Sequence, residues 1–164
     1  MMRVLVIMLS FIFLISCSSS HQGDLENADL IGYVIDKTEQ GMLVVSEEPI
    51  DFSETGGKSE YYEATWLSET PDDIEIGELV AVWYDGPVAE SYPMQATLGQ
   101  IKVVSKEPPD GADLSVAEAL REAIDIQGQT AAIKEIFYDQ ELDRWSITFK
   151  DLMSENESTI FVED

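Results

Sequence analysis

The 164-residue chain contains one cysteine, one histidine and nine lysine and arginine residues, against 33 aspartate and glutamate residues. A single cysteine cannot form an intramolecular disulfide, and one cysteine with one histidine is too few for a structural zinc site. Nucleophilic hydrolysis is also disfavoured, because there is no G-x-S-x-G motif and His21 lies in a polar segment without fixed geometry. The formal net charge of −24 excludes the basic surface that binds phosphate backbones, so we expect no nucleic-acid partner.

Long hydrophobic runs are missing too, except near the start of the chain. There an apolar run covers residues 4–15, which is too short to span a membrane and has the length of a signal-peptide core. The run ends in Leu14-Ile15-Ser16-Cys17, which resembles a bacterial lipobox. In such signals the cysteine sulfur is linked to diacylglycerol, and cleavage leaves that cysteine as the first residue. We therefore expect a lipoprotein signal peptide over residues 1–16, with Cys17 as the lipidation site.

Lipidation at Cys17 predicts where the protein resides. Acyl chains on this residue, palmitate among them, would hold it on the extracytoplasmic face of the cell membrane. Residues 17–29 are small and polar, which is typical of a flexible tether between the lipid and a folded part.

Short apolar runs separated by turn residues follow from Leu30 onward and indicate β-strands. The five runs cover residues 30–37, 42–46, 61–67, 79–85 and 98–104. Five strands of this length suit a small OB-like β-barrel, because closing a sheet on itself removes exposed edges. We expect this barrel over residues 30–106.

The remaining residues, 107–164, predict one helix followed by three strands. Pro108 and Pro109 break the chain, and Ser115 with Glu118 forms a capping-box pattern that opens a helix over residues 116–127. Strands are expected at residues 131–138, 144–150 and 158–163. The whole protein is thus predicted to be mainly β (α+β overall), with a small C-terminal module that packs on the barrel.

Three segments of the barrel region resemble a known family. They are GYVIDKTEQGMLVVS, YYEATWL and VWYDGPVAESYPMQATLGQIKVV, and together they look like the YobA-type domain of unknown function. That domain occurs in small lipoproteins of Gram-positive bacteria. The resemblance covers residues 31–104 and implies an OB-like barrel at the cell surface. It brings no established activity, cofactor, ligand or catalytic residue.

The segment 84–100 is the candidate ligand-binding loop, since the loop before the last strand of an OB-fold often borders the binding face. It combines aromatic rings with hydrogen-bonding groups, which suit a neutral or cationic ligand. Its candidate binding residues are Tyr84, Asp85, Glu90, Tyr92 and Gln95. The alternative is structural: Tyr92-Pro93 plugs the barrel mouth and Asp85-Gly86-Pro87 forms a turn. Trp66 and Trp83 are expected in the core because they lie on apolar strands.

These features favour a non-enzymatic binding or interaction module of the cell envelope, with no cofactor, catalytic residue or metal site expected. Its partners would be the membrane, through Cys17, and an envelope protein or a neutral or cationic cell-wall ligand. Two alternatives stay open, a carboxylate-dependent cell-wall hydrolase and an acidic cation-binding surface protein. Asp139, Glu141 and Asp143 alternate like calcium ligands, but a solvated hairpin tip explains them better.

Overall fold

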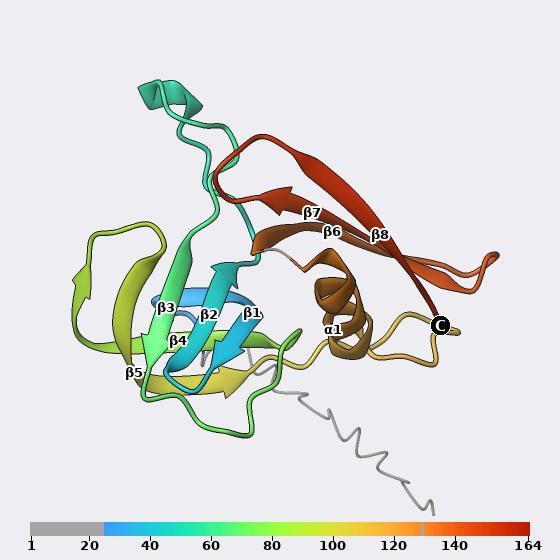
Figure 1. Cartoon of the computed structure of the whole chain (residues 1–164), viewed down its shortest axis with the longest axis horizontal. Coiled ribbons are helices and arrows are strands. Elements are labelled where there is room, and N and C mark those ends of the chain that lie inside the picture. Colours follow the sequence, from blue (N-terminus) through green and yellow to red (C-terminus); the bar gives the residue numbers. More distant parts are fainter. Residues whose placement is uncertain (1–24, 129) are drawn as a thin grey trace, which may run out of the picture.

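A computed structural model describes residues 25–128 and 130–164 (Figure 1). The expected signal peptide, Cys17 and the first part of the expected tether lie outside the described residues. Residues 25–27 form a turn, and Asp29 is already bonded to the barrel, its N–H donating to the Val82 carbonyl (2.8 Å). In the described part of the chain, no helix has the length and apolar character needed to cross a membrane.

Five strands form a closed barrel, which confirms the predicted fold class. They are β1 (Leu30–Thr38), β2 (Gly41–Ser46), β3 (Ala64–Ser68), β4 (Leu79–Ala89) and β5 (Met94–Val103). Their order is β1-β2-β3-β5-β4, with β1 pairing both β2 and β4. A bulge between Val34 and Asp36 bends β1, which pairs with β4 in its first half and with β2 along most of its length. The parallel pair β3–β5 completes the ring, and all other pairs are antiparallel.

The barrel interior is filled by aliphatic side chains from alternate positions of the strands. Val34, Val44, Val80 and Val82 are fully buried there, and Met42 and Leu67 pack beside them. Ile74, from the loop between β3 and β4, adds to the same cluster. Lys37 holds this loop in place by donating to the carbonyls of Asp72 (2.8 Å) and Ile74 (2.7 Å). The barrel interior is therefore a packed hydrophobic core.

The expected long loop over residues 84–100 is largely strand instead. β4 continues to Ala89 and β5 begins at Met94, so that only residues 90–93 connect them. Gly86, Pro87 and Val88 lie between the paired positions Asp85–Thr97 and Ala89–Gln95, opposite Ala96 alone. The turn-forming residues that indicated a loop thus form a wide bulge within a long hairpin.

The C-terminal module contains α1 (Val116–Gln127), β6 (Ala131–Asp139), β7 (Arg144–Asp151) and β8 (Glu157–Glu163). The predicted capping box is confirmed: Ser115 and Glu118 bond each other's backbone N–H groups, and Gly128 ends the helix in the left-handed conformation. The strands form a separate antiparallel sheet in the order β6-β7-β8.

Barrel and module share one hydrophobic core. The outward-facing side of β1 and β2 contributes Tyr33, Ile35, Leu43 and Val45 to it. From the other side come the buried face of α1 and the inner face of the sheet, with Ala119, Leu120, Ala123, Trp145, Ile147 and Phe149. In Figure 1 the helix lies between the barrel and this sheet. The expectation that the module packs on the barrel is therefore confirmed.

Asp164 fastens β8 to the start of the helix. Its carboxylate accepts hydrogen bonds from the backbone N–H groups of Asp113 (2.5 Å) and Leu114 (3.0 Å) and from the indole N–H of Trp145 (2.8 Å). Burial opposes ionisation of this carboxyl group, but these hydrogen bonds outweigh it and lower the pKa of Asp164.

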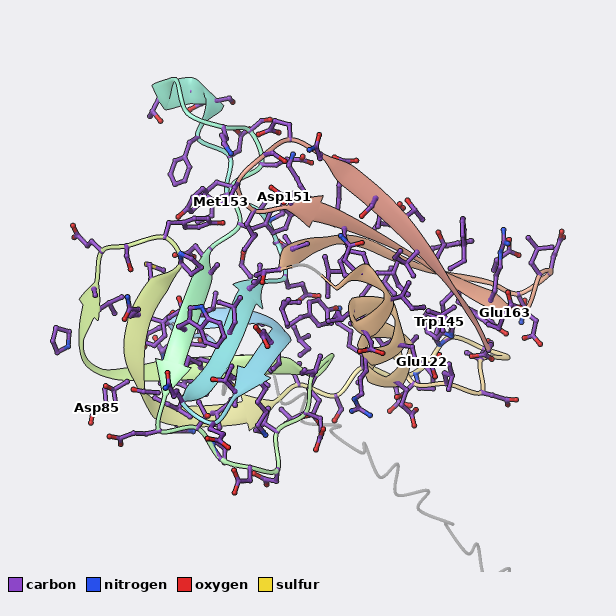
Figure 2. All side chains as sticks on the ribbon, in the orientation of Figure 1. Asp85, Glu122, Trp145, Asp151, Met153 and Glu163 are labelled. Carbon is purple, nitrogen blue, oxygen red and sulfur yellow. The ribbon has the colours of Figure 1, made fainter. Side chains whose placement is uncertain are left out.

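Ion pairs fasten the segment between β2 and β3 to the same module. Lys150 on β7 is 7% exposed and lies 2.6 Å from Glu60 and 2.9 Å from Glu155. Lys134 on β6 joins Glu60 (3.2 Å) to Glu157 (2.6 Å). Figure 2 places Asp151, the last residue of β7, and Met153, in the connection between β7 and β8, beside this projecting segment. These ion pairs thus hold the segment between β2 and β3 against the C-terminal sheet.

Candidate ligand-binding groove

An open groove of about 530 Å³ lies between the β1–β2 turn and the β4–β5 hairpin. β3 and β5 form its floor. Its lining consists of Thr38, Gln40, Trp66, Leu67, Ser68, Pro87, Ala89, Gln95, Ala96 and Thr97. The volume falls within the range of small-molecule sites, and the position matches the loops and strands that OB-folds use for ligands.

The strand register brings the two most prominent side chains together. Trp66 is paired with Leu43 on one side and, across the parallel ladder, with Gln95 on the other. Neighbours in one row of a sheet point to the same face, so Gln95 and Trp66 face the groove from adjacent strands. Trp66 rests partly on the shared core and is partly exposed, while Gln95 is exposed. The groove therefore presents an aromatic surface beside a hydrogen-bonding amide.

Hydroxyl and amide groups surround this pair. The Thr38 hydroxyl accepts from the Gln40 N–H (3.2 Å) and fixes the tight turn that carries the Gln40 side chain. On the opposite wall, the bulge at residues 86–88 brings Pro87 to the groove. Thr97 and Ser68 add hydroxyl groups along the floor.

Among the residues that the structure describes, no charged side chain lines the groove, although the chain has a net charge of −24. An anionic ligand would be repelled by the protein as a whole, and a cationic ligand would find no carboxylate within the groove. The lining is suited to a neutral, hydroxyl-rich ligand. Sugar rings meet this description, because their CH faces stack on indole and their hydroxyls bond amides and hydroxyls.

The five predicted binding residues do not converge on one site. Gln95 alone lines the groove. Asp85 and Glu90 are exposed, and Figure 2 shows the Asp85 side chain at the outer margin of the barrel. Tyr84 turns toward the barrel, with its hydroxyl 3.1 Å from Thr65 Oγ1, and burial raises the pKa of its phenol.

Tyr92 joins the β4–β5 hairpin to the segment between β2 and β3. Its hydroxyl donates to the Tyr62 carbonyl (2.9 Å), its ring lies 5.6 Å from that of Tyr61, and it packs against the shared core. Burial raises its pKa to about 12. Of the two interpretations given above, this contact resembles the structural one, although Tyr92 seals the flank of the barrel rather than its mouth.

Trp66, Gln40 and Thr38 line the groove but are not among the predicted binding residues, and Trp66 was expected in the core. Strand alternation already separates Trp66 from Leu67, whose side chain is buried inside the barrel. The missing information was the parallel pairing of β3 with β5, which has no local sequence signal. Trp66 and Gln95 are 29 positions apart in the sequence, and no local pattern indicates that they are neighbours in the fold.

Several acidic residues outside the groove accept structural hydrogen bonds. Hydrogen bonds from hydroxyl, ammonium or backbone N–H groups lower the pKa of several carboxyl groups: Asp51, Glu60, Glu118, Asp151 and Glu155. A general acid would need the opposite shift. At the β6–β7 tip, Asp139 accepts from the N–H groups of Glu141 and Leu142 (both 3.1 Å). Over the described ranges, no three or more acidic, cysteine or histidine residues are grouped so as to hold a metal ion.

Fold and groove together define a small OB-like barrel protein with an attached helix-and-sheet module. Residues 31–105 match the family described as "Protein of unknown function (DUF3221)". The match runs from β1 to the end of β5 and confirms the resemblance to a domain of unknown function, while the C-terminal module lies outside it. No curated protein and no solved structure matches the chain.

Proposed function

We propose that the protein is a lipid-anchored, non-enzymatic binding module of the cell envelope, and that its groove holds a neutral glycan. The single observation that carries the proposal is the uncharged groove around Trp66 and Gln95 in a chain of net charge −24. The lipobox-like sequence ending at Cys17 supports anchoring on the extracytoplasmic face. The resemblance of residues 31–104 to the YobA-type domain of small lipoproteins is consistent with this placement.

Binding is tested by calorimetric titration with neutral oligosaccharides of graded length, built from glucose or N-acetylglucosamine. The Gln95→Ala variant removes an exposed amide and should weaken binding about three- to tenfold, the effect of one hydrogen bond. Trp66→Ala removes the stacking surface and should weaken binding further. Glu90→Gln, on the same hairpin but outside the groove, is the matched control and should bind like the unmodified protein.

Two results would count against the glycan proposal. One is an affinity that stays constant in both groove variants while Glu90→Gln lowers it. The other is preferential binding of anionic polymers such as polyglutamate. Anchoring is tested separately: replacing Cys17 by serine should release the protein from the membrane fraction. Recovery of unmodified, full-length protein from membranes would refute the lipid anchor without affecting the groove.

A further inference from the structure

β8 is the edge strand of the C-terminal sheet, since only β7 pairs with it. Two hydrogen bonds just outside the ladder fix its register: the Asp164 N–H donates to the Asp143 carbonyl (3.2 Å), and the Asp151 N–H donates to the Asn156 carbonyl (3.0 Å). In an antiparallel pair, hydrogen-bonded and non-hydrogen-bonded positions alternate. Residues 158, 160 and 162 therefore direct their backbone groups toward β7.

The backbone groups of residues 157, 159, 161 and 163 consequently point to the open side of β8. Thr159 and Phe161 are at its centre, and both residues are exposed. No strand in the described part of the chain lies on that side. The edge thus offers unpaired N–H and C=O groups in the spacing that an added strand requires.

An aromatic row on the outer face of the sheet leads to this edge. Phe137 on β6 is paired with Ser146 on β7, which is paired with Phe161 on β8. Phe137 and Phe161 are 57% and 52% exposed, and the Arg144 guanidinium lies 4.4 Å from the centre of the Phe161 ring. A strand added to β8 would place a side chain directly beside Phe161 and cover its free side.

Charge decides what kind of strand fits. Glu163 stands at one end of β8 and Glu157, already paired with Lys134 (2.6 Å), at the other, and the protein as a whole carries a net charge of −24. A second copy of the chain would bring equal negative charge to the same edge and be repelled. A segment with lysine or arginine at its ends and alternating apolar residues between them would be attracted.

From this edge we infer that β8 accepts an extended, basic segment of another protein as a fourth strand of the sheet. The backbone of Thr159 and Phe161 supplies the hydrogen bonds and the Phe161 ring supplies apolar contact, while Glu163 and the net charge of −24 favour a cationic partner. This interaction surface lies on the C-terminal sheet and does not depend on the groove.

The test uses a synthetic peptide that alternates valine and threonine and has lysine at both ends, with a glutamate-ended peptide as its counterpart. Calorimetry should show binding of the lysine peptide only. Thr159→Pro removes an outward N–H without breaking the ladder to β7, and should weaken binding at least about tenfold. Thr159→Val keeps the N–H and loses only the hydroxyl, so it should bind like the unmodified protein.

Amide hydrogen exchange in the unmodified protein gives a readout that does not depend on how a proline variant folds. The lysine peptide should slow exchange at Thr159 and Phe161 and leave Ile160, already bonded to β7, unchanged. Unaltered exchange at Thr159 and Phe161 in saturating peptide would overturn the inference. So would protection of both amides by protein concentration alone, since that result would assign the edge to a second copy.

Discussion

Gly77 lies where the barrel meets the helix, and replacing it tests how firmly the two parts are joined. Its N–H donates to the Val34 carbonyl (2.9 Å), and its φ of +91° is a conformation that side chains disfavour. A Cβ atom at this position would lie 2.3 Å from the carbonyl oxygen of Ala117 in the first turn of α1. Because that neighbour is helix backbone, it cannot rotate away.

The expected cost of Gly77→Ala has two parts. A side chain in a left-handed conformation costs about 1–2 kcal/mol. Forcing the helix away from the barrel resembles overpacking, which costs about 1–3 kcal/mol. The free energy of unfolding should therefore fall by about 2–5 kcal/mol, which in a chain of this size lowers the melting temperature by about 5–15 °C.

Gly86→Ala is the matched control. Gly86 has a similar φ of +81°, but a Cβ atom there meets nothing within 4 Å. It should show only the backbone cost of about 1–2 kcal/mol. Urea unfolding of both variants, with the denaturant slope compared, separates the two contributions. If Gly77→Ala were no more destabilising than Gly86→Ala, the close contact between the β3–β4 loop and α1 would be refuted.

Three further predictions concern the shared core and its ionisable groups. Leu120→Ala, at a fully buried position, should cost about 2–5 kcal/mol and preserve a single unfolding transition; two separate transitions would contradict one shared core. The lowered pKa of Asp164 stabilises the fold above the unfolded value near 4 and loses this effect as pH falls. In the Asp164→Asn variant, the free energy of unfolding should therefore fall less steeply as the pH drops below about 4. An equally steep fall would refute a stabilising role of the Asp164 carboxylate. Tyr92, with a pKa of about 12, should lose stability as pH rises above about 10, and Tyr92→Phe should remove that loss in urea titrations.

Local signals allowed much of the fold to be predicted. The helix begins and ends where Ser115, Glu118 and Gly128 indicate, because caps act through backbone groups within one turn. The three strands of the C-terminal sheet match their predicted runs to within a residue or two at each end. Alternation and turn residues determine such elements with little help from tertiary contacts.

The site was harder to predict because it depends on which strands meet. Asp85-Gly86-Pro87 is a strong turn signal, yet the long β4–β5 hairpin incorporates these residues as a bulge. Tyr92 combines a ring and a hydroxyl, which suit ligand binding and a structural contact with the segment between β2 and β3 equally well. Trp66 lies on an apolar strand and was expected in the core, but the closing pair β3–β5 leaves part of its ring exposed beside Gln95. These outcomes follow from topology, which no short segment encodes.

The family match ends at residue 105, but the barrel it delimits is not self-sufficient. Much of the surface that buries Tyr33, Ile35, Leu43 and Val45 comes from side chains of α1 and the C-terminal sheet. A fragment that ends at residue 105 would expose this apolar surface of β1 and β2 to solvent and would tend to aggregate. The family match and the hydrophobic core thus end at different residues. A fragment for expression should contain the barrel together with its C-terminal helix and sheet.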